Sequence, residues 1–294
     1  MYNNNFVEFK KERDLGAIIS DTFKFLRLEW KPFFGAILKT AFLPIILAIA
    51  ALFFYTFSFP NIFGTNIDIY EDGIYQEPNL GLLFTSIFAV CVFFLIAYVI
   101  MNITALYYIK SYVDNNGKVD FEMIKERVKD KFWSFTGLFI LVGIIVVISA
   151  LLCFFPAIYT GVVLSLAAPI LVYHNMGVSD TVSYSFSFVK GHWWETFGVM
   201  FVVGIITTVA GYIFSIPAMI YFFIKMGTII SANDPAILAE SLVDPIYLIL
   251  NGISYIGQFI LYGVTLVSSV LIYFDINEQK NASGAIDKIN SLGN

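Results

Sequence analysis

The sequence predicts an all-α integral membrane protein, and its composition is the first reason. Of its 294 residues, 59% are hydrophobic and only 13% are charged, and the mean hydropathy is +0.79. A soluble domain carries about 25% charged residues, so this chain has too little charge to cover a water-soluble globule. Its apolar runs are continuous rather than alternating, which favours membrane-spanning helices over the strands of a barrel.

Stretches without Asp, Glu, Lys or Arg predict where the transmembrane helices lie, because a helix needs about 20 residues to cross the hydrocarbon. The uncharged stretch 132–179 is too long for one crossing, and the turn-forming sequence PAIYTG at 156–161 is expected to divide it. We therefore expect a single membrane domain, 1–294, with a tail at 276–294. Its six spans are expected at about residues 33–57, 80–109, 135–156, 161–176, 196–224 and 245–274.

The basic residues predict the orientation of the spans. All of the Lys and Arg residues except Lys225 fall at the N-terminus, in the connections 110–131 and 180–195, in the tail, or just inside the first span. By the positive-inside rule, these segments face the cytoplasm and the loops 58–79 and 226–244 face outward. We expect a multi-pass protein of the cytoplasmic (inner) membrane of a bacterium, with both termini cytoplasmic. No cleavable signal peptide is expected, because the N-terminus is polar and the first apolar run is too long.

Three cytoplasmic segments have the pattern of amphipathic helices lying in the membrane interface, at residues 14–31, 120–133 and 178–194. Each contains tryptophan near its end and is followed by a pair of expected spans. Indole is wide and apolar with one N–H donor, so it settles at headgroup depth. The expected membrane-interface anchors are Trp30, Trp133, Trp193, Trp194, Lys190 and Arg27.

Two of these segments match each other without a gap. FLRLEWKPFFG at 25–35 and FVKGHWWETFG at 188–198 share Phe, Trp, Phe and Gly at equivalent positions. The middle segment aligns weakly, through Phe132, Trp133 and Gly137. The pattern predicts a pseudo-threefold repeat of an interfacial helix and a helical hairpin. The alternative is that membrane proteins in general place aromatic and basic residues at the cytoplasmic boundary.

The stretch APILVYHNMGVSDTVSYSFSFVKGHWWETFG, 168–198, resembles a broad bacterial family of polytopic proteins. This family is related to the membrane domain found beside some glycerophosphoryl diester phosphodiesterases. The shared features are a proline-bearing span, a short polar turn, a Ser-rich amphipathic helix and a Lys-Gly-His-Trp segment. The tail YFDINEQKNASGAIDKI, 273–289, is similar to the ends of Bacteroidetes-type members. The resemblance implies a polytopic fold but no activity, since most such proteins have none assigned.

The sequence contains no recognisable catalytic, cofactor or metal motif. It has no P-loop, HExxH, GxSxG or CxxC pattern, and acidic residues are absent from the centre of every expected span. We therefore expect no catalytic residue, no cofactor, no metal ligand and no enzymatic activity. A proton pump is disfavoured for the same reason. Cys91 and Cys153 lie in apolar runs and are expected to be reduced core residues.

A few uncharged polar residues lie within the expected spans. Asn251 and Gln258 are seven residues apart in the sixth span, so both could line one helix face toward a cavity. Asn102 lies toward the inner end of the second span, and His174 lies at the inner end of the fourth. These four are the candidate cavity-lining residues. The simpler interpretation, hydrogen bonding between helices, is favoured because uncharged amides commonly join helices in membrane bundles.

Two function classes follow from these observations. The first is a membrane-embedded scaffold or envelope-maintenance protein without catalysis. The second is a transporter or lipid-handling protein with a polar cavity between the helical hairpins. The expected partners are membrane lipids, with anionic headgroups attracted by the basic residues of the cytoplasmic face, and nucleic acid is not expected. A polar cavity within the membrane would favour the second class.

Overall fold

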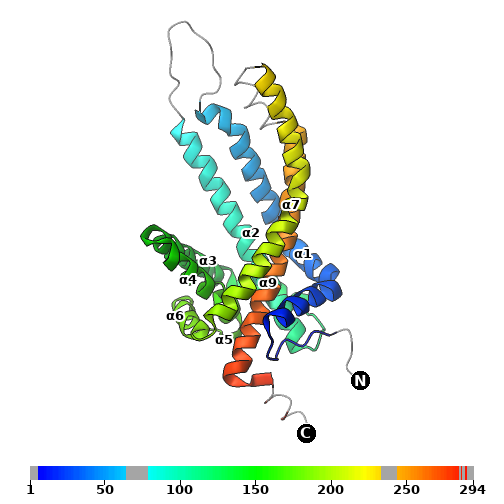
Figure 1. Cartoon of the computed structure of the whole chain (residues 1–294), viewed down its shortest axis with the longest axis vertical. Coiled ribbons are helices and arrows are strands. Elements are labelled where there is room, and N and C mark those ends of the chain that lie inside the picture. The colour runs from blue at the N-terminus through cyan, green and yellow to red at the C-terminus, as the bar shows by residue number, and fades with distance from the viewer. Residues whose placement is uncertain (1–5, 64–78, 233–243, 285, 287–288, 290–294) are drawn as a thin grey trace. The chain divides into compact units, whose positions relative to one another are not determined.

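The computed structural model describes residues 6–63, 79–232, 244–284, 286 and 289, and within these residues it contains helices and no strands (Figure 1). The helices are α1 (Leu15–Phe63), α2 (Leu80–Asp114), α3 (Phe121–Leu152), α4 (Phe154–Leu164), α5 (Ala167–His174), α6 (Val178–Val189), α7 (Trp193–Ala232) and α9 (Pro245–Asn281). Six segments are long and apolar enough to cross a membrane, with mean hydropathies from 1.9 to 2.8. The predicted class, an all-α membrane protein with six spans, is confirmed.

The helix boundaries differ from the expected ones in α1 and α3. Each of these helices continues without a break from the expected interfacial segment into the span. Only the third interfacial segment forms a separate helix, α6, which ends at Val189 before α7 begins at Trp193. The break contains Gly191, whose φ of +90° is a conformation that glycine adopts without strain. The equivalent position in the first segment is Leu28, which stays helical.

The turn between the third and fourth spans was predicted at 156–161, and this prediction is wrong. The chain turns at Cys153, whose backbone is extended, and residues 156–161 lie inside α4. Pro156 is the third residue of α4. The first N–H groups of a helix have no partner within it, so proline is tolerated in the first turn.

The fourth span, Phe154–His174, consists of two helices rather than one. Helix α4 ends at Leu164 and α5 begins at Ala167, so Ser165 and Leu166 form a short break. No side chain caps the start of α5. The two cysteines, expected in the core, are both exposed, Cys91 on α2 and Cys153 at the turn between α3 and α4, and neither is disulfide-bonded. In a membrane protein such an exposed surface is in contact with lipid, so exposed apolar residues are not out of place there.

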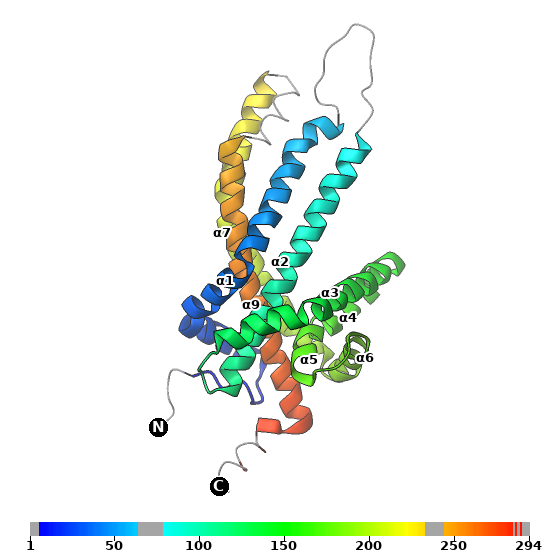
Figure 2. The ribbon, with the colours of Figure 1, turned by 180° about the vertical axis from the view of Figure 1, so that it is seen from behind.

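The chain divides into two compact units, which we describe separately. Unit one consists of Met1–Thr40, Tyr98–Thr207 and Tyr262–Asn294, and unit two of Ala41–Ala97 and Thr208–Leu261. In unit one, α3 and α4 lie side by side as a hairpin, with α5 and α6 packed against it (Figures 1 and 2). The tip of this hairpin is apolar and exposed, for example at Leu151 (82%) and Phe155 (79%).

Unit two is held together by close packing of α7 against α9. Ser254 donates a hydrogen bond to the carbonyl of Phe214 at 2.8 Å. Asp244 caps the start of α9 by accepting from the backbone N–H of Ile246 at 2.9 Å. The same carboxylate pairs with Lys225 of α7 at 3.0 Å and accepts from the hydroxyl of Tyr221. The hydrogen-bonded Lys225 ammonium lowers the pKa of Asp244 from 3.8 to about 2.

Candidate functional site: a polar cavity at a helix break

A cavity of about 220 Å³ lies in unit one, beside the break between α4 and α5. Ser165 is in the break itself, and Ala167 to Pro169 form the first residues of α5. Helices α2, α3, α7 and α9 complete the wall. The lining residues are Tyr98, Asn102, Leu138, Phe139, Val142, Gly161, Leu164, Ser165, Ala167, Ala168, Pro169, Met200, Tyr262, Thr265, Leu266 and Ser269.

Asn102 is the central polar group of this cavity, and its side chain is almost fully buried. Its amide nitrogen donates to the carbonyl of Tyr98 at 2.8 Å, one turn earlier on α2. Its amide oxygen accepts from the hydroxyl of Tyr262 on α9 at 3.2 Å. The ring of Tyr98 lies 5.4 Å from that of Tyr262 and 4.7 Å from that of Phe139. Asn102 therefore joins α2 to α9 at the cavity wall.

Two serine hydroxyls in the lining donate hydrogen bonds to backbone carbonyls three residues earlier in the chain. Ser165 donates to the carbonyl of Val162 at 2.7 Å, and Ser269 donates to the carbonyl of Leu266 at 2.8 Å. A hydroxyl that donates in this way keeps two lone pairs that can accept hydrogen bonds. Within the described part of the chain, no charged residue lines the cavity. The lining is therefore suited to an uncharged molecule that is mostly apolar and carries a few hydrogen-bonding groups.

The depth of the cavity follows from α3. Leu138 and Val142 lie five and nine residues beyond Trp133, which at about 1.5 Å per residue is roughly 8–14 Å along the helix. The side chain of Trp133 is 78% exposed, as is suitable for an indole at the membrane interface. Backbone groups released from helical hydrogen bonding at this depth are tolerated where they are buried in protein or line a cavity. Ser165 and Leu166 keep right-handed helical dihedral angles, so the break is a local turn, and Ser165 lines the cavity.

The four candidate cavity residues are not brought together. Asn102 lines the cavity of unit one, while Asn251 lines a different cavity in unit two. Gln258 is exposed and is not a lining residue of either cavity. His174 packs between aromatic rings, 4.8 Å from that of Tyr184, and its Nε2 has no hydrogen-bond partner among the described residues.

The six expected interface anchors lie at or near exposed surfaces. Trp30 and Trp194 are 53% and 77% exposed, and Arg27 and Lys190 are also exposed. Trp193 differs, because its ring stacks on Phe197 with centroids 5.2 Å apart. All four tryptophans lie within a few residues of a long apolar segment. None of these six side chains lines the cavity of unit one.

Tyr262, Thr265 and Ser269 form the polar part of the cavity lining contributed by α9 and were not predicted as site residues. Their spacing of three and four residues places them on one helix face, and this periodicity was the signal available in the sequence. The N-terminal segment 6–13 was not predicted to be structured, and it packs against other parts of unit one through specific contacts. The backbone N–H of Val7, for example, donates to the hydroxyl of Tyr112 at 3.0 Å.

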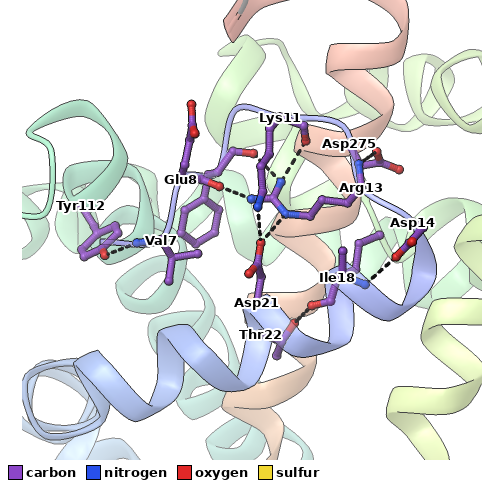
Figure 3. A network of polar contacts seen from close by, with 12 residues as sticks. Val7, Glu8, Lys11, Arg13, Asp14, Ile18, Asp21, Thr22, Tyr112 and Asp275 are labelled. Atoms are coloured by element: carbon purple, nitrogen blue, oxygen red, sulfur yellow. Dashed lines mark hydrogen bonds and ion pairs between the residues drawn. The ribbon is translucent and has the colours of Figure 1, made fainter. Parts of the chain in front are cut away.

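Arg13 organises this N-terminal segment (Figure 3). Its side chain is fully buried and donates to Asp21 at 2.9 Å, to the carbonyl of Phe9 at 2.7 Å and to the carbonyls of Glu8 and Lys11. Its backbone N–H donates to Asp275 of α9 at 2.7 Å. Burial lowers the pKa of the Arg13 guanidinium, and the hydrogen bond to Asp21 opposes this effect. The network therefore ties the N-terminal segment to α1 and to the end of α9.

Comparison with known proteins gives no match: no family model, no curated protein and no solved structure corresponds to this chain. Within the described residues, no group of three or more His, Cys, Asp or Glu side chains is placed to hold a metal ion. The site is thus defined by its own geometry, as an uncharged cavity among membrane-spanning helices.

Proposed function

We propose that this integral membrane protein handles a lipid or a similar uncharged amphipathic molecule, which it binds in the cavity of unit one. The observation that carries the proposal is the hydrogen-bonding lining at the broken fourth span, with Asn102, Ser165 and Ser269 beside apolar side chains. The cavity is smaller than the roughly 300–1,000 Å³ of typical small-molecule sites. It suits part of a molecule, such as a small headgroup or a segment of an acyl chain.

Polar groups without hydrogen-bond partners are costly in hydrocarbon. A hydroxyl or amide that faces lipid without a partner is unfavourable by several kcal/mol. Here the polar groups come from α2, α9 and the turn between α4 and α5, and they keep accepting lone pairs, which a ligand with a hydroxyl or amide proton can use. An anionic group would meet no cation in the lining, so a neutral ligand is favoured. No reaction is required for this function.

The test compares Asn102→Leu with Thr104→Val after purification in native lipid. Thr104 lies on the same helix, is fully buried and bonds to Thr40 at 2.8 Å, but it does not line the cavity. We expect one neutral lipid to be enriched with the wild-type protein and with Thr104→Val. Asn102→Leu removes about one hydrogen bond of 0.5–1.5 kcal/mol, which corresponds to a roughly 2- to 12-fold loss of that lipid. Equal lipid content in all three proteins, measured by mass spectrometry, would contradict the proposal.

A scaffold or envelope-maintenance role is the second candidate function. It is favoured by the buried Arg13 network, which packs the N-terminal segment onto unit one, and by the exposed indoles of Trp133 and Trp194. Such a protein would retain protein partners rather than a particular lipid. Chemical crosslinking in intact membranes, followed by mass spectrometry of the captured proteins, distinguishes this role from the first.

We further propose that both termini face the cytoplasm of a bacterial inner membrane. The contact between Arg13 and Asp275 supports a location of the two ends on one side, as an even number of spans requires. The basic side chains of Arg27 and Lys190 would then face anionic headgroups, each contributing about 1 kcal/mol of attraction. Membership of the phosphodiesterase-associated membrane family is part of the same proposal, and it rests on the resemblance of 168–198.

A further inference from the structure

Unit two contains a cavity of its own, of about 210 Å³, between α1 and α9. Its polar lining consists of three tyrosines and two further uncharged residues, and the rest of the lining is apolar. The polar members are Tyr55, Thr56, Tyr247, Asn251 and Tyr255. This cavity shares no residue with the cavity of unit one. Its ligand preference can therefore be derived independently.

The depth of this cavity follows from the ion pair at the start of α9. Asp244 and Lys225 are 3.0 Å apart, and charged side chains are costly within hydrocarbon, so this pair marks the membrane boundary. Tyr247 and Tyr255 lie three and eleven residues after Asp244, which is roughly 5–16 Å along the helix at about 1.5 Å per residue. The cavity therefore extends from headgroup level into the first part of the acyl region.

The hydrogen bonds of Thr56 and Asn251 define what the cavity can recognise. Thr56 donates its hydroxyl proton to the carbonyl of Leu52 at 2.9 Å, and Asn251 donates an amide proton to the carbonyl of Tyr247 at 2.9 Å. The hydroxyl oxygen of Thr56 and the amide oxygen of Asn251 keep lone pairs that can accept. Among the residues that the structure describes, no charged side chain lines the cavity. A ligand with several hydroxyl protons satisfies these acceptors, whereas a phosphate, which lacks such protons and needs a cation, does not.

We propose that this cavity binds the neutral headgroup of a membrane lipid that carries several hydroxyls, such as the sugar of a glycosylated diacylglycerol. The tyrosine rings supply flat apolar surfaces for the carbon skeleton of such a headgroup. The neighbouring surface is apolar and exposed, as at Phe57 (52%) and Ile249 (64%), and would contact the acyl chains. The depth below the ion pair favours a lipid over a soluble sugar.

The test uses the full-length protein in phosphatidylcholine nanodiscs with a photoactivatable glycosylated diacylglycerol. We expect crosslinks to the peptides that contain Thr56 and Asn251. The double variant Thr56→Val with Asn251→Leu removes both acceptors and should weaken labelling about tenfold, as two hydrogen bonds of about 0.5–1 kcal/mol each imply. Gln258→Leu is the matched control, because Gln258 is an exposed amide on the same helix outside the cavity. It should label as the wild type does.

Competition identifies the source of the headgroup. Unlabelled glycosylated diacylglycerol should suppress the crosslink, whereas free glycerol, free glucose and phosphatidylglycerol should not. Suppression by a free sugar or by phosphatidylglycerol would overturn the proposal, and so would equal labelling of the double variant and the control.

Two further variants complete the test. Thr56→Val alone, which is nearly isosteric, should show an intermediate loss if the double variant fails to fold. Asn102→Leu should leave the crosslink unchanged, so failure of this inference is distinguishable from failure of the proposed function.

Discussion

Arg13 shows how one side chain can fix an otherwise extended segment. Its guanidinium presents donors in a rigid planar fork, and here that fork meets one carboxylate and three backbone carbonyls. Lys11 also pairs with Asp21, at 2.9 Å, but its side chain is 42% exposed whereas that of Arg13 is fully buried. Because a buried charge relies on its partners more than an exposed one does, the two basic residues should contribute very differently to stability.

We predict that Arg13→Gln destabilises the protein by about 3–5 kcal/mol, because it leaves the buried network without its cation. Lys11→Gln should cost no more than about 1 kcal/mol, since an exposed ion pair contributes little. Denaturant unfolding in detergent micelles, followed by tryptophan fluorescence, measures both variants. Similar denaturant midpoints for Arg13→Gln and Lys11→Gln would show that the Arg13 network does not stabilise the folded state.

Helix α9 packs closely against α7 in unit two, at Gly257. A Cβ atom at Gly257 would lie 2.3 Å from the Cγ atom of Phe214 on α7, so no larger residue fits without movement. At Gly252, five residues earlier on the same helix, no atom lies within 4 Å of the same position. In membranes, small residues let helix backbones approach closely and so gain van der Waals contact.

We predict that Gly257→Ala destabilises the protein by about 1–3 kcal/mol through overpacking against Phe214. Gly252→Ala should be neutral or stabilising, because alanine is about 1 kcal/mol better than glycine in a helix interior. Thermal unfolding of the two variants in the same detergent provides the comparison. If Gly252→Ala lost as much stability as Gly257→Ala, the loss would come from replacing any glycine of α9 and not from the contact with Phe214.

At the scale of elements, the transmembrane spans were predictable from hydrophobicity. The turns and helix breaks, which depend on local backbone geometry, were not. The lengths of apolar runs identified six spans, because crossing hydrocarbon demands length and little else. The turn at Cys153 carries no glycine, proline or polar signal, and Pro156 suggested a turn while starting a helix. The matching segments around Trp30 and Trp193 differ in backbone because Gly191 breaks one helix where Leu28 continues the other.

The candidate site was less predictable, because a cavity depends on how distant helices meet. Asn102 stood out in the sequence as an amide in an apolar run, but its partner Tyr262 lies 160 residues away. Asn251 and Gln258 share a helix spacing that suggested a common face. The structure separates them, with Asn251 at a cavity and Gln258 exposed. A single polar residue of the site can therefore be found from the sequence. The other residues that line the cavity can be identified only from the way the helices pack.

At the scale of the whole molecule, the topology is the property on which both lipid proposals depend. The tryptophans at positions 30, 133 and 194 begin or precede long apolar segments, and their exposed indoles suit one membrane interface. Two candidate spans separate Trp30 from Trp133, and two more separate Trp133 from Trp194. Because each number is even, the chain returns to the same side of the membrane each time. The three positions should consequently share one aqueous compartment.

We predict that cysteines at Trp30, Trp133 and Trp194 react with a membrane-impermeant maleimide only after cells are permeabilised. The variants Trp30→Cys, Trp133→Cys and Trp194→Cys are made in a background with Cys91→Ser and Cys153→Ser, which removes both native thiols. Asp72→Cys, in the loop expected to face outward, is the control and should react in intact cells. Labelling of the Trp194 position alone in intact cells, with the other two protected, would mean that an odd number of crossings separates Trp133 from Trp194. The spans around α4 and α5 would then have to be reassigned, because the broken fourth span is the one most able to enter and leave the membrane on the same side.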